Sequence, residues 1–243
     1  MTGNANPVRA HSRHPVFYTK TVIFLVEDCL FRIPREPLEA ESIVFRDMFL
    51  LPQGDKVTAE GCSDANPVLL NGIKKKDFEP LLKALLCSLL ELFTNCGGRK
   101  YGEYRGEPLG NEQWISVLKL STMWEFDGLR RSAINNLASK SMNPVDKFSL
   151  AILYDVTEWI MPALLKLAQR PEPISFEEGR RLGFETALKL ASVREKFRID
   201  PRAACRLCEG KHKNTVERLI VGNRDKGTEE LDFTPVIRAA FNL

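Results

Sequence analysis

Histidine is scarce in this sequence, with three residues in 243. Two of them, His11 and His14, lie in residues 1–15, which are rich in Asn, Arg and Pro, show no periodicity and are predicted to form a disordered tail. Only His212 remains outside this tail, and the sequence contains no GxGxxG, GxxxxGK[ST], GxSxG or HExxH motif. We therefore expect a protein that is not an enzyme and binds no cofactor.

Long hydrophobic runs are also missing. The longest apolar helical stretch, residues 81–93, contains Lys83 and Glu91 and is too short to span a bilayer. The start of the chain has no signal-peptide pattern, and the cysteines lack the spacing of a disulfide framework. These six cysteines are Cys29, Cys62, Cys87, Cys96, Cys205 and Cys208. We expect an intracellular protein, cytoplasmic or nuclear, with reduced thiols.

Enough apolar residues remain for a packed core, since 44% of the chain is hydrophobic. A chain of 243 residues can form one large domain, or one domain of about 120 residues and a smaller helical one. The net charge is only +3, but residues 194–226 hold ten basic and five acidic side chains. The basic character is therefore concentrated near the C-terminus.

The segment VIFLVEDCLFRIP, residues 22–34, predicts a β-hairpin. Residues 22–26 are an unbroken run of β-branched, aliphatic and aromatic side chains, which is typical of a strand buried on both faces. Glu27 and Asp28 supply the turn, and residues 29–33 alternate until Pro34 removes a backbone donor.

Two short helices are predicted after the hairpin. Pro37 suits a first helical turn, and Ser42 is a candidate N-cap for the second helix. In that helix the apolar side chains recur at helical spacing and must face a core or a partner. They are Val44, Phe45, Met48 and Phe49.

This order of elements resembles the BTB/POZ family, in which a strand is followed by a phenylalanine, a basic residue, a leucine and a serine, and then by Phe-Arg-x-Met-Phe. The matching positions here are Val22, Phe31, Arg35, Leu38, Ser42, Phe45, Arg46, Met48 and Phe49. The runs PREPLEAES and VLKLSTMWEFDGLR are similar to those of fungal, basidiomycete-type members. Thr21 and Pro34 depart from the family pattern, where aspartate and histidine are common.

The resemblance covers about residues 16–140 and implies an α/β fold, a small β-sheet flanked by helices. It includes a third strand at 68–70, a following helix, and a last helix pair at 114–137. It also implies a homodimer and the recruitment of other proteins, as an adaptor or scaffold, with a cullin-type ubiquitin ligase or a transcriptional complex as partner. The implied dimer interface contains Val16, Phe17, Tyr18, Pro37, Leu38, Val44, Phe45, Met48 and Phe49.

An insert interrupts the resemblance at about residues 87–110, where glycine is frequent and the family's helix-closing Tyr-Thr-Gly is missing. We expect a protruding loop or a frayed extension of the preceding helix there. Beyond the insert, the apolar positions recur with a helical period and predict two inward faces. One holds Trp114, Val117, Leu118, Ser121 and Trp124, and the other Phe126, Leu129, Ala133, Ile134 and Leu137.

Residues 141–199 predict an all-helical extension. Asn143 and Pro144 supply the cap and the first turn of one helix. A second helix begins close to Pro162, because proline is tolerated only in the first turn of a helix. Ser175 and Glu178 have the spacing of a capping box. The capping box precedes a longer amphipathic helix marked by Phe184, Leu188, Ala191 and Glu195. This extension is predicted to support the first domain, and the alternative is a groove for a partner.

Residues 200–243 form a basic C-terminal segment. Cys205, Cys208 and His212 are candidate metal ligands, but a fourth ligand and a knuckle turn are missing, so we favour simple packing and no metal. The basic residues suggest nucleic-acid binding as the alternative function, although interleaved aromatics and a helix-turn-helix pattern are missing. Lys74, Lys75 and Lys76 are interpreted as a solvated helix start.

Overall fold

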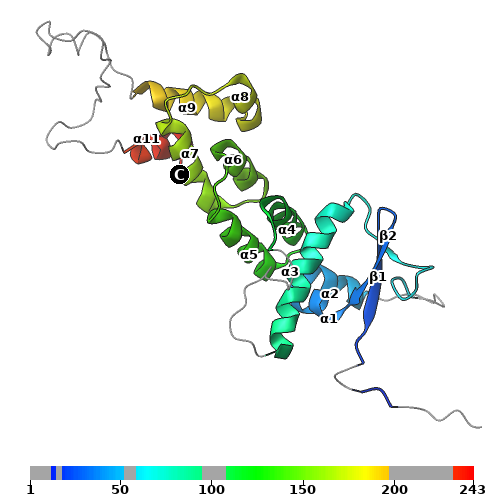
Figure 1. Cartoon of the computed structure of the whole chain (residues 1–243). Coiled ribbons are helices and arrows are strands. Elements are labelled where there is room, and N and C mark those ends of the chain that lie inside the picture. The colour runs from blue at the N-terminus through cyan, green and yellow to red at the C-terminus, as the bar shows by residue number, and fades with distance from the viewer. Residues whose placement is uncertain (1–11, 15–17, 52–58, 95–107, 197–231) are drawn as a thin grey trace, which may run out of the picture. The chain divides into compact units, whose positions relative to one another are not determined.

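The computed structural model describes residues 12–14, 18–51, 59–94, 108–196 and 232–243, with only the helical backbone described for 87–94 and 196. The chain divides into two compact units, Met1–Ser139 and Lys140–Leu243. Each unit builds its core from its own helices and strands, so each is described by itself (Figure 1).

The first unit is built on a three-stranded sheet with the order β2-β1-β3. Strands β1 (Thr21–Val26) and β2 (Cys29–Pro34) form the predicted hairpin, with Val26 paired to Cys29 across the turn. Glu27 has a φ of 54°, the left-handed conformation that such a tight turn requires. Strand β3 (Val68–Leu69) pairs parallel to β1, which makes the sheet mixed and the fold α/β, as predicted.

The central position of β1 explains its composition. It has a hydrogen-bonded neighbour on each edge and is covered on both faces, so nearly all of its side chains are buried. Gly61 lies against β1: its carbonyl accepts a hydrogen bond from Ile23 N–H at 2.8 Å, and its N–H donates to the Asn66 carbonyl at 2.7 Å. Gly61 has a φ of +80°. These two bonds anchor the loop before β3.

Five helices complete the first unit: α1 (Glu36–Glu41), α2 (Ile43–Leu50), α3 (Lys75–Thr94), α4 (Asn111–Met123) and α5 (Asp127–Ala138). Ser42 caps α2 as predicted, since its Oγ accepts from Phe45 N–H at 3.1 Å. The same Oγ donates to the Trp124 carbonyl at 2.5 Å. One buried hydroxyl therefore joins α2 to the α4–α5 corner.

Aromatic side chains fill the space between the sheet and these helices. The Phe45 ring lies 5.7 Å from that of Phe24, 5.2 Å from that of Trp124 and 5.7 Å from that of Phe126. Phe78 of α3 contacts Phe24 edge-to-face at 5.9 Å. Such T-shaped pairs are favourable beyond their buried area. The two predicted inward faces of α4 and α5, which include Trp114 and Trp124, are buried here.

In the second unit the described residues contain helices and no strand: α6 (Pro144–Leu153), η1 (Thr157–Trp159), α7 (Ile160–Gln169), α8 (Phe176–Leu182), α9 (Phe184–Lys196) and α11 (Thr234–Phe241). The predicted caps are confirmed: Asn143 Oδ1 accepts from Val145 N–H, and Ser175 with Glu178 forms a capping box. Pro162 lies in the first turn of α7, as expected.

The region after the capping box differs from the prediction of one longer amphipathic helix. Gly183, at a φ of +83°, ends α8 after two turns and starts α9 in a new direction. The chain returns at α11, which was not predicted and which contributes Phe233 and Ile237 to the core. That core consists of Val145, Phe148, Ala163, Leu164, Leu167, Ala168, Leu182, Leu190, Val193, Phe233 and Ile237.

Among the described residues, the helices are either too short or too polar to cross a membrane.

Candidate protein-interaction surfaces

The residues predicted for the dimer interface fall into three groups. Leu38 and Phe45 are 0% and 1% exposed, and Pro37 is buried with them, so these three belong to the core of their own unit. A spacing pattern does not distinguish a core from a partner surface, and the structure buries these three within the chain, while the dimer interface itself stays a prediction. Val16 and Phe17 lie outside the described residues. The others remain at the surface, at least in part.

Helix α2 carries a compact apolar surface, which we call the α2 face. Ile43, Val44, Leu50 and Leu51 are exposed, Leu50 by 74%, and Met48 is half-buried beside them. Ile43 and Leu50 of α2, and Val44 and the C-cap Leu51, are each seven residues apart and lie on the outer side of the helix, with the exposed Asp47 between them. Phe45 holds the inner side. An exposed apolar cluster of this kind marks a surface for another protein.

Phe49 and Tyr18 are both covered by arginine. The Arg35 guanidinium lies 4.0 Å from the centre of the Phe49 ring and donates through Nη2 to the Phe49 carbonyl at 3.1 Å. Arg13 lies 4.8 Å from the centre of the Tyr18 ring. Such cation–π contacts shield an aromatic face. The apolar side chains in the open part of the α2 face are therefore aliphatic, and they flank the exposed Asp47.

The second unit has a groove between α8 and α9, of about 640 Å³. Its walls carry two exposed phenylalanines, Phe176 (87%) and Phe184 (83%), and Leu188 (58%). The complete lining is Pro173, Ile174, Ser175, Phe176, Gly179, Arg180, Phe184, Ala187, Leu188, Ala191, Arg194 and Glu195. We call this the α8–α9 groove.

The residues that marked α9 as amphipathic lie on the open side of the groove. Phe184, Leu188, Ala191 and Glu195 share this open face, and α9 packs inward through Leu190 and Val193. Small side chains form the floor, because a Cβ on Gly179 would lie 3.8 Å from the Ala187 Cβ. The sequence signal for this arrangement was available in Gly183, which interrupts the helical pattern directly before Phe184.

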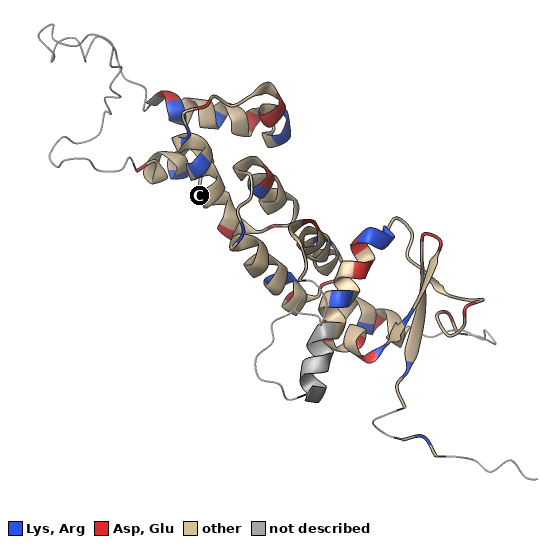
Figure 2. Cartoon of the chain, in the orientation of Figure 1, with Lys and Arg blue, Asp and Glu red and all other residues tan. Residues whose placement is uncertain are grey.

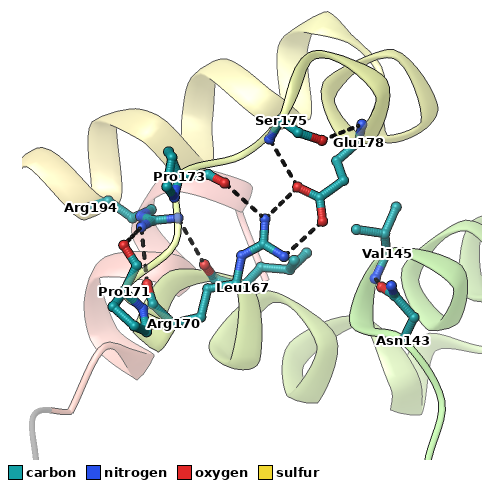
Figure 3. Close-up of polar contacts among 9 residues, drawn as sticks. All are labelled: Asn143, Val145, Leu167, Arg170, Pro171, Pro173, Ser175, Glu178 and Arg194. Carbon is teal, nitrogen blue, oxygen red and sulfur yellow. Dashed lines mark hydrogen bonds and ion pairs between the residues drawn. The ribbon is translucent and has the colours of Figure 1, made fainter.

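A bidentate ion pair fixes α8 to the end of α7 (Figure 3). Arg170 donates through Nη1 and Nη2 to the two carboxylate oxygens of Glu178 at 2.8 and 2.5 Å. Glu178 Oε2 also accepts from Ser175 N–H at 2.9 Å, and Glu178 N–H donates to Ser175 Oγ at 3.2 Å. The Arg170 guanidinium and the Ser175 backbone lower the pKa of Glu178 from 4.5 to about 2.

A second arginine fixes α9 in the same region. The Arg194 guanidinium donates to the carbonyls of Arg170 at 3.0 Å and Pro171 at 3.2 Å, and to that of Leu167 at 3.5 Å (Figure 3). These carbonyls include the unpaired ones at the C-terminal end of α7. The two arginines therefore hold both walls of the groove on a fixed support.

The Arg170–Glu178 pair predicts a pH dependence. Because the pKa of Glu178 is lower in the folded chain than in the unfolded one, the pair contributes its full stability above pH 4.5 and loses it as the pH falls towards 2. We expect about 1–2 kcal/mol to be lost in this range, allowing for solvent screening. Urea unfolding followed by tryptophan fluorescence measures it.

The matched control for this prediction is Glu178→Gln, which keeps the shape of the side chain but cannot titrate. The stabilities of the wild-type chain and the variant are expected to differ at pH 7 and to converge near pH 2. A constant difference across that range would mean that the ion pair has no net effect on stability.

A charged cleft of about 540 Å³ lies between α3 and α4. Its most buried acid, Asp77, accepts hydrogen bonds from Ser116 Oγ and Lys119 Nζ, both at 2.8 Å. Burial alone would raise the pKa of Asp77, but these hydrogen bonds outweigh it and lower that pKa. Lys74 and Lys76 at the rim are exposed, in agreement with a solvated helix start. Figure 2 shows basic positions in blue at the start of α3. The Asp77 contacts explain the cleft as a packing feature between two helices.

The candidate metal ligands Cys205, Cys208 and His212 lie outside the described residues, as do most of the basic stretch 194–226 and residues 95–107 of the predicted insert. Cys29 and Cys62 have free thiols.

A scan against models of protein families found no match for this chain, and a search among curated proteins found none either.

Proposed function

We propose that this chain is a BTB/POZ-like protein-interaction module that self-associates through the α2 face and brings a protein partner into the assembly, as an adaptor or scaffold. The order hairpin, two short helices, third strand and helix agrees with the family resemblance of residues 16–140. No catalytic step is part of the proposal. The proposed site of action is inside the cell, in the cytoplasm or the nucleus.

One observation supports self-association most directly: four aliphatic side chains cluster on the α2 face with high exposure. A stable interface buries about 1,200–2,000 Å² in total, and its centre is apolar. The α2 face can supply such a centre, and β-sheet and helices behind it hold α2 rigid through Phe45 and Ser42. Pre-organised surfaces of this kind lose little entropy on binding.

The family resemblance suggests two classes of protein partner, a cullin-type ubiquitin ligase or a transcriptional complex. The proposed module recruits a partner of one of these two classes. Because it self-associates, it presents two copies of its partner site. Bivalent presentation raises the apparent affinity without any new contact.

The test is Leu50→Glu, which places a charge at the most exposed apolar position of the α2 face. We expect this substitution to weaken self-association about tenfold or more, because an unpaired charge would be buried at the interface. The average mass of the full chain, measured by light scattering coupled to gel filtration at tens of micromolar, is expected to be at least twice 27.6 kDa and to fall in the variant.

Leu69→Glu is the matched control, since Leu69 is also an exposed leucine of the first unit (54%) but lies on β3. The control is expected to keep the mass of the wild-type chain. An equal mass for wild type and Leu50→Glu, with the fold intact by circular dichroism, would contradict self-association through the α2 face.

A further inference from the structure

The α8–α9 groove of the second unit exposes Phe176, Phe184 and Leu188, and the described residues do not cover them. We propose that a second copy of this chain covers the groove, with the two α9 helices packed antiparallel about a two-fold axis. This surface is separate from the α2 face, and the inference does not depend on the proposed function.

The first argument is the size pattern along α9. Two pairs of a large and a small residue follow each other along its open face. The first pair is Phe184 and Ala187, and the second is Leu188 and Ala191. In an antiparallel pair, opposed positions run in opposite directions along the two helices. The register that places Phe184 opposite Ala191 of the second copy therefore also places Leu188 opposite Ala187. Each large side chain meets a small one, which allows close helix packing.

The second argument is charge. Arg180, in the last turn of α8, lines the groove at the end where α9 begins, and Glu195 lines it at the other end. Arg180 is highly exposed, with the Glu177 carboxylate at 4.0 Å. The antiparallel register brings Arg180 of one copy towards Glu195 of the other, twice by symmetry. Such a self-complementary pattern is the requirement for a two-fold interface.

The third argument is area. The exposed parts of Phe176, Phe184 and Leu188 amount to about 400 Å² per copy, or about 800 Å² for a pair, given the size of these side chains. A stable interface needs about 1,200 Å² or more in total. Ile174, Pro173 and the arginine stems along the same groove can supply the rest.

A chain with two separate two-fold surfaces forms assemblies of more than two copies, because each surface recruits a further chain. Light scattering of the full chain at tens of micromolar is then expected to give a mass above twice 27.6 kDa. Leu188→Glu is expected to weaken association through the groove at least tenfold and to leave dimers. Leu153→Glu, an exposed leucine of α6 in the same unit (68%), is the matched control and should not change the mass.

Charge reversal identifies the occupant. Arg180→Glu and Glu195→Arg should each weaken association several-fold. A chain that carries both substitutions should associate like the wild type, because Glu at position 180 of one copy then faces Arg at position 195 of the other. Another protein in the groove would not be restored in this way. A double reversal that is as weak as either single variant, or a Leu188→Glu chain with the mass of the wild type, would overturn the proposal.

The two surfaces can be told apart by combining variants. If both exist, Leu50→Glu and Leu188→Glu each leave dimers and together give monomers. If the α2 face is inactive, the wild type is a dimer and Leu188→Glu alone gives monomers. If the groove is inactive, Leu50→Glu alone gives monomers. Thermal unfolding of each variant checks that loss of association is not loss of folding.

Discussion

Replacing Phe45 with alanine is expected to destabilise the first unit by about 3–5 kcal/mol, the range found for deletion of a buried aromatic ring. The Phe45 side chain is 1% exposed and contacts the rings of Phe24, Trp124 and Phe126. The sheet, α2 and the α4–α5 corner all border this ring, so the surroundings cannot collapse onto the cavity. A loss of this size is a large part of the stability of a typical domain.

Urea unfolding followed by tryptophan fluorescence measures this loss, and Trp124 beside Phe45 is a local reporter. Met123→Ala is a suitable control, because Met123 lies next to Trp124 in sequence but is 52% exposed, and we expect it to cost less than about 1 kcal/mol. A Phe45→Ala chain as stable as Met123→Ala would show that the aromatic cluster is not the centre of the core.

Gly61→Ala is expected to destabilise the first unit by about 2–4 kcal/mol, for two independent reasons. The φ of +80° is unfavourable for alanine, and its Cβ would lie 2.9 Å from Cγ2 of both Val22 and Val68. Both neighbours are β-branched residues held in strands, so neither can rotate away. The new methyl group would push the loop away from β1 and strain its hydrogen bond with Ile23.

Gly72→Ala separates the two reasons. Gly72 also has a φ of +80°, but a Cβ there meets nothing within 4 Å. We expect this control to cost only about 1 kcal/mol, the backbone term alone. Equal losses in the two variants, measured by the same unfolding experiment, would mean that the loop moves freely and that the close contacts to Val22 and Val68 do not matter.

The elements of the first unit could be predicted because their signals are local. The run at residues 22–26 identified a strand buried on both faces, and Ser42 acted as the cap that its side chain suggested, as did Asn143 in the second unit. Their partners were harder to predict. Leu38 of α1 and Val44 of α2 look alike in a hydrophobic pattern, yet one is in the core and the other is exposed, because the tertiary packing decides which side of each helix is covered.

The α8–α9 groove could be predicted only in part. The amphipathic face of Phe184, Leu188 and Ala191 was identified correctly, but its exposure depends on a direction set by Gly183 and on Arg194, which binds carbonyls 23 and 24 residues away in sequence. Long-range polar contacts of this kind leave no periodic signal. The same is true of α11, whose Phe233 and Ile237 join a core made mostly of residues before 194.

The contribution of α11 to that core has a consequence for synthesis of the protein on the ribosome. The core residues of the first unit all precede residue 139, so this unit can complete its fold while the rest of the chain is still being translated. The second unit lacks Phe233 and Ile237 until its last helix emerges. At roughly 5–20 residues per second, the helices α6 to α9 wait several seconds with an unfinished apolar surface, the period in which a nascent chain most needs a chaperone.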